Sequence, residues 1–279
     1  MKKLADEIKS MDIHPGIWLR PLLTVEFVPD EYYIKAADGE KLSDEYILKN
    51  NLYRTMDPSE PFVLAKIAED VKTLADWGYE LIKFDFTTLD LMHRPGSAWG
   101  EDFTDGGWTF GDKSKTTAQI LKNMYKTIRE AAGENAIVIG CNTIGHLGTG
   151  YFEMQRTGGD TSGDEWDRTR RMGVNTLAFR MPQHGIFYDI DADCVGITKN
   201  ITWQQNREWL RLLSVSGTPL FVSVAEDAYN DEVKAALAEA FEKAEKNIVP
   251  ARPADWFDTK IPARWETAFG EYKFNWHLE

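Results

Sequence analysis

The chain has little cysteine and little histidine. It contains two cysteines, Cys141 and Cys194, and five scattered histidines in 279 residues. The cysteines lie too far apart in sequence for a metal-binding pair, and the histidines form no zinc pattern. The two thiols could pair with each other, but we expect two buried free cysteines. The sequence therefore gives no reason to expect a metal site.

The chain also lacks long apolar runs and an excess of positive charge. No apolar segment is long enough to span a bilayer, and no signal peptide is recognisable. The formal net charge of −13 argues against nucleic acid, because phosphate binding needs clustered lysine and arginine. It also gives no reason for attraction to anionic lipid. We expect a neutral substrate, no nucleic-acid or membrane partner, and a cytoplasmic location.

Strand-like and helix-like segments alternate along most of the chain. This rhythm predicts a parallel sheet with right-handed helical crossovers. Polar residues gather after the strands and before the helices, as in the site of a (β/α)8 barrel. A doubly wound sheet is the competing fold, but no glycine-rich dinucleotide or phosphate-binding fingerprint is present. We predict an α/β fold of the (β/α)8 barrel type over residues 1–249 and an irregular tail over 250–279.

The strand-like segment 80–86 ends in a lysine and an aspartate, Lys83 and Asp85. Side chains two residues apart on a strand point to the same side. A lysine beside a carboxylate favours the ionised form, which a nucleophilic carboxylate must keep. This pattern indicates a catalytic position at a strand end, although an ordinary ion pair would have the same sequence.

A second basic and acidic pair, Arg156 and Asp160, occurs in the segment 156–160. Two carboxylates with basic neighbours are typical of glycosidic bond cleavage. Asp160 would then be the acid that protonates the leaving oxygen. As an alternative, Asp160 or Asp164 would cap the following helix. Trp18 is either a platform for a sugar ring or a core residue.

In order and spacing, these segments resemble the clan D glycoside hydrolases, the α-galactosidase group of families 27 and 36. The resemblance covers most of the chain and is carried by residues 16–18, 81–85, 141–142, 156–160, 191–193 and 216–223. It implies that Asp85 is the nucleophile and Asp160 the acid/base. It further implies a sugar pocket shaped by Lys83, Arg156, Trp18, Cys141, Asn142 and Asp193.

The chain departs from this family in two places. Asn142 stands where some relatives have glutamate, which leaves the preferred sugar open. The first two barrel strands of the family have no counterpart, so the resemblance implies a barrel incomplete at its N-terminus, with about six βα units. An open barrel exposes unpaired strand edges. We expect the 22–58 loop, the C-terminal tail or another copy of the chain to cover them.

The resemblance implies an enzyme of carbohydrate metabolism. Its expected activity is a retaining exo-glycosidase that hydrolyses terminal α-galactosides through a covalent glycosyl-aspartate, without a metal or organic cofactor. Two alternatives stay open. One is a catalytically silent barrel fragment or sugar-binding scaffold. The other is a glycosidase for a related sugar, such as α-N-acetylgalactosamine or β-L-arabinopyranose.

Overall fold

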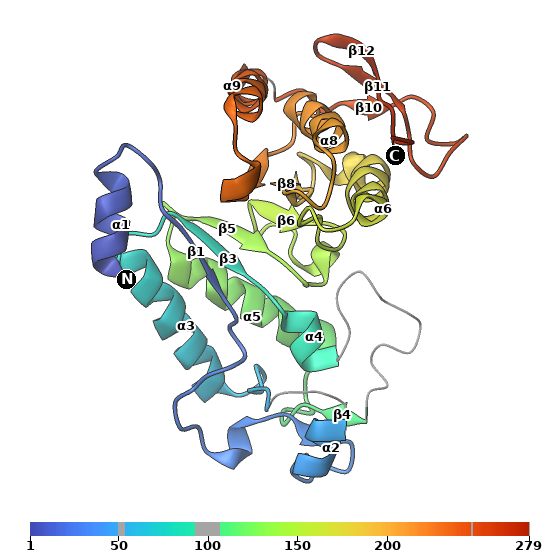
Figure 1. Ribbon diagram of the computed structural model, residues 1–279. Helices are drawn as coiled ribbons and strands as arrows, with labels where there is room; N and C mark the ends of the chain where they lie inside the picture. The colour runs from blue at the N-terminus through green and yellow to red at the C-terminus, as the bar shows by residue number, and fades with distance from the viewer. Residues whose placement is uncertain (50–53, 93–106, 247, 279) are drawn as a thin grey trace. The chain divides into compact units, whose positions relative to one another are not determined.

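The computed structural model describes residues 1–49, 54–92, 107–246 and 248–278 (Figure 1). The chain divides into two compact units, Met1–Met154 and Gln155–Glu279. Each unit has its own buried hydrophobic cluster. The two units are therefore described separately.

The first unit is built on parallel strands backed by helices. Strands β1 (Gly16–Leu19), β3 (Leu81–Phe84) and β5 (Ile137–Gly140) pair in parallel in the order β1-β3-β5. Helices α3 (Pro61–Asp76) and α5 (Thr117–Ala132) lie along one face of these strands (Figure 1). Ile82 and Phe84 of β3 are fully buried in the same hydrophobic cluster as the apolar residues of both helices. The opposite face of the strands carries Trp18, Lys83 and Ile139, which the parallel register places side by side.

The helices of this unit begin and end where local chemistry predicts. Pro61 stands at the start of α3, where its missing N–H costs nothing. Gly78 follows the helix with φ of 96°, a conformation that favours glycine. At the start of α5, Thr116 and Gln119 form a reciprocal capping box. The remaining elements are α1 (Lys2–Lys9), η1 (Asp30–Tyr32), β2 (Lys35–Ala36), α2 (Asp44–Lys49), α4 (Thr87–Met92), β4 (Trp108–Thr109) and η2 (Gly145–Leu147).

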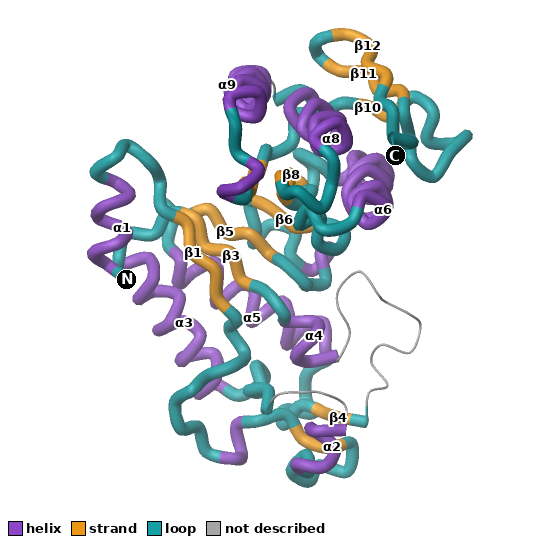
Figure 2. The backbone as a smooth tube through the Cα atoms, viewed as in Figure 1, coloured by secondary structure: helices purple, strands orange, loops and turns teal. Residues whose placement is uncertain are grey.

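The second unit also alternates strands with helices (Figure 2). Its strands are β6 (Met154–Arg156), which leads into the unit, β7 (Asp189–Asp191), β8 (Cys194–Ile197) and β9 (Phe221–Val224). Strands β8 and β9 pair in parallel. Its helices are α6 (Trp166–Arg168), the π-helix η3 (Thr169–Asn175), α7 (Thr176–Arg180), η4 (Met181–Gln183), α8 (Trp203–Val215), η5 (Glu226–Ala228) and α9 (Asp231–Lys246). Parallel strands and intervening helices confirm the predicted α/β class.

The segment 250–279, expected to be irregular, contains an ordered antiparallel sheet. Strands β10 (Arg252–Pro253), β11 (Arg264–Thr267) and β12 (Gly270–Lys273) pair in that order. Trp265 and Trp276 are buried, and the indole N–H of each donates to the carbonyl oxygen of Pro262, at 3.0 and 2.7 Å. Strands β11 and β12 each contain a single large apolar residue, Trp265 and Tyr272, among polar ones, so they lack the apolar pattern that predicts a strand. The domain boundary at residue 249 stays a prediction.

This sheet is expected to stabilise the second unit. Trp265→Ala should lower the free energy of unfolding by about 3–5 kcal/mol, because it removes a fully buried aromatic side chain and leaves a cavity. Phe257→Ala removes an aromatic side chain that is 87% exposed and should have little effect. Urea unfolding of both variants measures the difference. Equal midpoints for the two variants would mean that the sheet contributes little to the fold.

Candidate active site

Trp18 and Lys83 lie on the face of the β1-β3-β5 strands away from the helices. The register of the parallel pair places Trp18 opposite Lys83. Ile17 and Leu19, the neighbours of Trp18, pack against the core, whereas the Trp18 side chain is 49% exposed. Because strand side chains alternate, Lys83 points away from the buried Ile82. Cys141 and Asn142 follow β5 directly, at the same edge.

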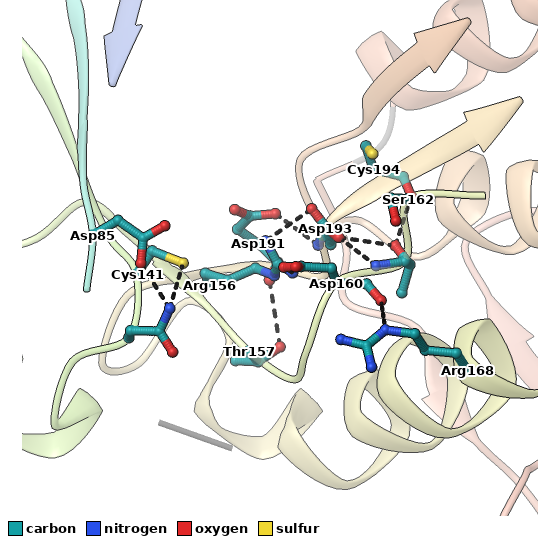
Figure 3. Close-up of polar contacts among 12 residues, drawn as sticks. Asp85, Cys141, Arg156, Thr157, Asp160, Ser162, Arg168, Asp191, Asp193 and Cys194 are labelled. Atoms are coloured by element: carbon teal, nitrogen blue, oxygen red, sulfur yellow. Dashed lines mark hydrogen bonds and ion pairs between the residues drawn. The ribbon is translucent and has the colours of Figure 1, made fainter. Parts of the chain in front are cut away.

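Asp85, which follows β3, is held by three hydrogen bonds (Figure 3). Its Oδ1 accepts hydrogen bonds from Asn142 Nδ2 at 2.7 Å and from the Phe86 main-chain N–H at 2.6 Å. Its Oδ2 accepts from Trp18 Nε1 at 3.2 Å. A carboxylate has only acceptor atoms when ionised, so three converging donors fix its orientation in that form. Cys141 is buried, with its Sγ 4.0 Å from Asn142 Nδ2.

Left-handed backbone conformations gather at these strand ends. Among the described residues other than glycine, four have positive φ: Asp12, Phe86, Asn142 and Asp193. The last three follow β3, β5 and β7 within two residues. Such conformations cost free energy for side chains larger than glycine, and they concentrate at functional sites. At Phe86 the conformation accompanies the hydrogen bond from its N–H to Asp85.

Arg20 lies over the Phe86 ring and pairs with Asp90, and the sequence patterns pointed to neither residue. The Arg20 guanidinium carbon lies 4.4 Å from the centre of the Phe86 ring, and Arg20 Nε donates to Asp90 Oδ2 at 3.0 Å. Asp90, in α4, is 4% exposed. Burial raises the pKa of the Asp90 carboxyl, an effect opposed by Arg20 and reinforced by the charge of Asp85. The two partners are 70 residues apart, so no local pattern links them.

The raised pKa of Asp90 predicts a pH dependence of stability. A carboxyl whose pKa is higher in the folded state than in the unfolded state stabilises the fold when the pH is below its unfolded-state pKa, which is 3.8 for Asp90. This contribution is lost as the pH rises through the folded-state pKa. The difference in unfolding free energy between wild type and Asp90→Asn should therefore decrease as the pH rises above 3.8. Urea unfolding across this range measures it. The exposed control Asp76→Asn should give no such trend, and parallel curves for Asp90→Asn would contradict the prediction.

In the second unit, one arginine joins two aspartates (Figure 3). Arg156, at the end of β6, has a side chain that is 6% exposed. Its Nη2 donates to Asp160 Oδ1 at 2.8 Å, and its Nη1 lies 2.9 Å from Asp193 Oδ1. Asp193 Oδ2 also accepts from the Thr161 main-chain N–H at 2.6 Å. Arg156, Asp160 and Asp193, predicted from separate motifs, therefore form one cluster.

Asp160 does not cap a helix. The next helix, α6, has Glu165 at its N-cap without a side-chain hydrogen bond, and Asp164 is bonded to Ser162 and Asn200 instead. The Asp160 side chain is 73% exposed. An exposed carboxyl held at one oxygen can reach a bound molecule, as an acid/base must.

The described residues give further negative findings. They contain no group of three or more histidine, cysteine, aspartate or glutamate residues able to hold a metal ion. None of their helices has the length and apolar character needed to cross a membrane. Both cysteines are free thiols; Cys141 is buried, and Cys194 is half-buried rather than fully buried. Burial raises the pKa of Cys194 to about 11.

The predicted site residues thus form two groups. Trp18, Lys83, Asp85, Cys141 and Asn142 belong to the first unit, whereas Arg156, Asp160 and Asp193 belong to the second. The one carboxylate of the first group and the two of the second have the hydrogen-bond partners described above. The convergence of Asp85 and Asp160 on one sugar carbon stays a prediction.

No protein-family model matches the chain. Solved structures do resemble it. An α-galactosidase from Thermus thermophilus, in complex with p-nitrophenyl α-D-galactopyranoside, superposes with a TM-score of 0.64 at 18% identity, over 98% of this chain and 54% of that one. A GH27 β-L-arabinopyranosidase from Geobacillus stearothermophilus gives 0.61 at 14% identity, over 90% and 58%. A GH31 sulfoquinovosidase from E. rectale gives 0.62 at 12% identity, over 100% and 46%.

These similarities identify the fold. The chain has the fold type of (β/α)8-barrel glycoside hydrolases, as the motifs predicted, and no closed barrel is formed by the residues that the structure describes. The chain spans about half the length of the solved proteins that it resembles. The resemblance to the α-galactosidase group is therefore confirmed at the level of fold.

Proposed function

We propose that this chain carries the machinery of a retaining exo-glycosidase for terminal α-galactosides. In this proposal Asp85 is the nucleophile and Asp160 the general acid/base. The observation that carries it is the contrast between two carboxylates that follow strand ends. Asp85 is held by three hydrogen-bond donors, whereas Asp160 is bonded to Arg156 and is largely exposed. A nucleophile needs a fixed direction, and an acid/base needs access to the leaving group and then to water.

The proposed reaction has two steps. Asp85 attacks the anomeric carbon while the bond to the leaving oxygen breaks and Asp160 gives its proton to that oxygen. Asp160 then removes a proton from water, which attacks the glycosyl-aspartate and releases the sugar and Asp85. Lys83, Arg156, Trp18, Cys141, Asn142 and Asp193 would bind the sugar. The indole N–H of the half-exposed Trp18 and the Asn142 amide each donate a hydrogen bond to Asp85. A sugar that contacts these two side chains would therefore lie next to the proposed nucleophile.

The similar proteins support the choice of substrate class. Solved structures of the Thermus enzyme contain p-nitrophenyl α-D-galactopyranoside or stachyose. Another neighbour is an α-galactosidase from Mortierella vinacea. We therefore propose α-galactosides and galacto-oligosaccharides as substrates, without a metal or organic cofactor. A preference for β-L-arabinopyranosides or α-N-acetylgalactosaminides would show in the same assay, which should contain aryl glycosides of all three sugars.

Substitution of the two carboxylates tests the proposed roles. Asp85→Asn should abolish turnover of p-nitrophenyl α-galactoside, because no covalent intermediate can form. Asp160→Asn should lower turnover of an alkyl galactoside by about 10²- to 10⁴-fold, the usual contribution of a general acid/base. Asp76→Asn and Asp164→Asn are matched controls, since each removes one exposed carboxylate, and both should remain active.

Azide distinguishes the two roles. For this test each carboxylate is replaced by alanine, which leaves room for azide. Azide should restore activity to both Asp85→Ala and Asp160→Ala. In Asp85→Ala azide displaces the leaving group directly, and this single inversion gives the β-galactosyl azide. In Asp160→Ala azide attacks the glycosyl-aspartate, and the second inversion gives the α-galactosyl azide. Full activity in both Asn variants would refute the assignment. Galactose binding by calorimetry without turnover of any glycoside would favour the silent sugar-binding scaffold.

We also propose that another copy of the chain covers an open strand edge. β1 stands at one end of the strand order, so one of its edges has no strand neighbour in the described part of the chain. An uncovered edge presents free N–H and C=O groups that favour pairing. Size-exclusion chromatography with light scattering should give a mass of at least two chains. A monomer at all concentrations would contradict this proposal.

A further inference from the structure

The loop that carries Asp160 lies against the π-helix Thr169–Asn175. Gly158 has φ of 70°, and a Cβ at this position would lie 2.2 Å from the carbonyl oxygen of Met172. A Cβ at Gly159 would lie 3.3 Å from the Met172 sulfur. Glycine at 158 is therefore required for the main chain to approach the helix so closely. π-Helical segments are rare and often occur at functional sites.

Arg168, at the end of α6, connects this helical segment to Asp160 itself (Figure 3). Its Nε donates to the main-chain carbonyl oxygen of Asp160 at 2.7 Å. Its Nη2 would lie 3.2 Å from a Cβ at Gly159, so the guanidinium follows the loop backbone. Arg170 and Arg171 both pair with Asp167. The contact that distinguishes Arg168 from these two arginines is therefore its bond to the Asp160 loop.

We propose that Arg168 is a positioning residue that holds the Asp160 carboxyl in line with the leaving-group oxygen. This inference rests on the proposed function. The Asp160 side chain is 73% exposed, so its direction depends strongly on the main chain that carries it. The peptide group between Asp160 and Thr161 is held at both of its polar atoms: its carbonyl oxygen accepts from Arg168, and its N–H donates to Asp193. Arg156 then sets the direction of the carboxyl within this frame.

The role has a chemical signature. In the first step the Asp160 proton passes to the glycosidic oxygen as its bond to the anomeric carbon breaks and the bond to Asp85 forms. An alkoxide leaves poorly, so an alkyl galactoside needs this proton in the transition state. A nitrophenolate leaves without much help. Misalignment of Asp160 should therefore slow the alkyl substrate far more than the aryl substrate, whereas general destabilisation would slow both equally.

Three variants of the full chain test the inference. Arg168→Met removes every donor at similar length, and Arg168→Lys restores one donor and the charge. Arg171→Met is the matched control, because Arg171 is a 60% exposed neighbour that pairs with Asp167. The measured quantity is kcat/KM for methyl α-galactoside and for p-nitrophenyl α-galactoside, together with the melting temperature.

We expect Arg168→Met to lower kcat/KM for the methyl galactoside by about 10- to 100-fold and that for the nitrophenyl galactoside only slightly. Arg168→Lys should recover part of the loss, and Arg171→Met should behave as wild type. An equal loss on both substrates, or no loss on either, would overturn the positioning role while the glycosidase proposal stands. If Arg168→Met does not fold, Arg168→Lys decides by the same ratio. A wild-type chain inactive on every glycoside would instead overturn the proposed function, and this inference with it.

Discussion

The arrangement of the first unit depends on the parallel register of β1, β3 and β5. Parallel pairing brings the carboxyl ends of the strands to one edge, and the register sets Trp18 opposite Lys83. Residues that are far apart in sequence therefore supply Asp85 with its hydrogen-bond donors: the Trp18 indole from β1 and the Asn142 amide from the end of β5. The buried alternation of Ile82 and Phe84 against the helices keeps this register, since a shift by one residue would exchange the two faces.

The two carboxylates at strand ends differ in how they are held. Asp85 is bound at both oxygens, next to a left-handed Phe86 that is itself packed under the Arg20 guanidinium. Asp160 is largely exposed, with one carboxylate oxygen bonded to Arg156 and its main-chain carbonyl bonded to Arg168. In the proposed mechanism, Asp85 as the nucleophile needs a fixed direction, whereas Asp160 as the acid/base needs access to the leaving group and to water. The structure assigns a different environment to each.

Much of this organisation could be predicted from the sequence. Alternating apolar patterns indicated the parallel strands, and the positions of Asp85 and Asp160 after strands indicated their place at the strand ends. The supporting contacts could not be predicted in this way. Arg20 and Asp90 meet through the fold across 70 residues, and Arg168 lies before a π-helix, whose period differs from the one that apolar patterns detect. The strands around Trp265 were missed because each contains at most one large apolar residue, unlike the apolar runs of β3 and β5.

The fold similarity and the local contacts contribute different parts of the account. Solved structures at 12–18% identity establish the type of fold. The proposed roles of individual residues are argued from the hydrogen bonds and ion pairs that each residue makes. Asn142, for example, donates to Asp85, which is the basis for placing it beside the proposed nucleophile.

The central claim is that Asp85 forms a covalent bond to the sugar. The most direct measurement is mass spectrometry of the chain after incubation with a fluorinated galactosyl fluoride, which forms a slowly hydrolysed glycosyl-enzyme with retaining enzymes. The account predicts one added glycosyl group, located by peptide mapping on Asp85. A label on another carboxylate, or continued turnover with no label and inverted product, would contradict it.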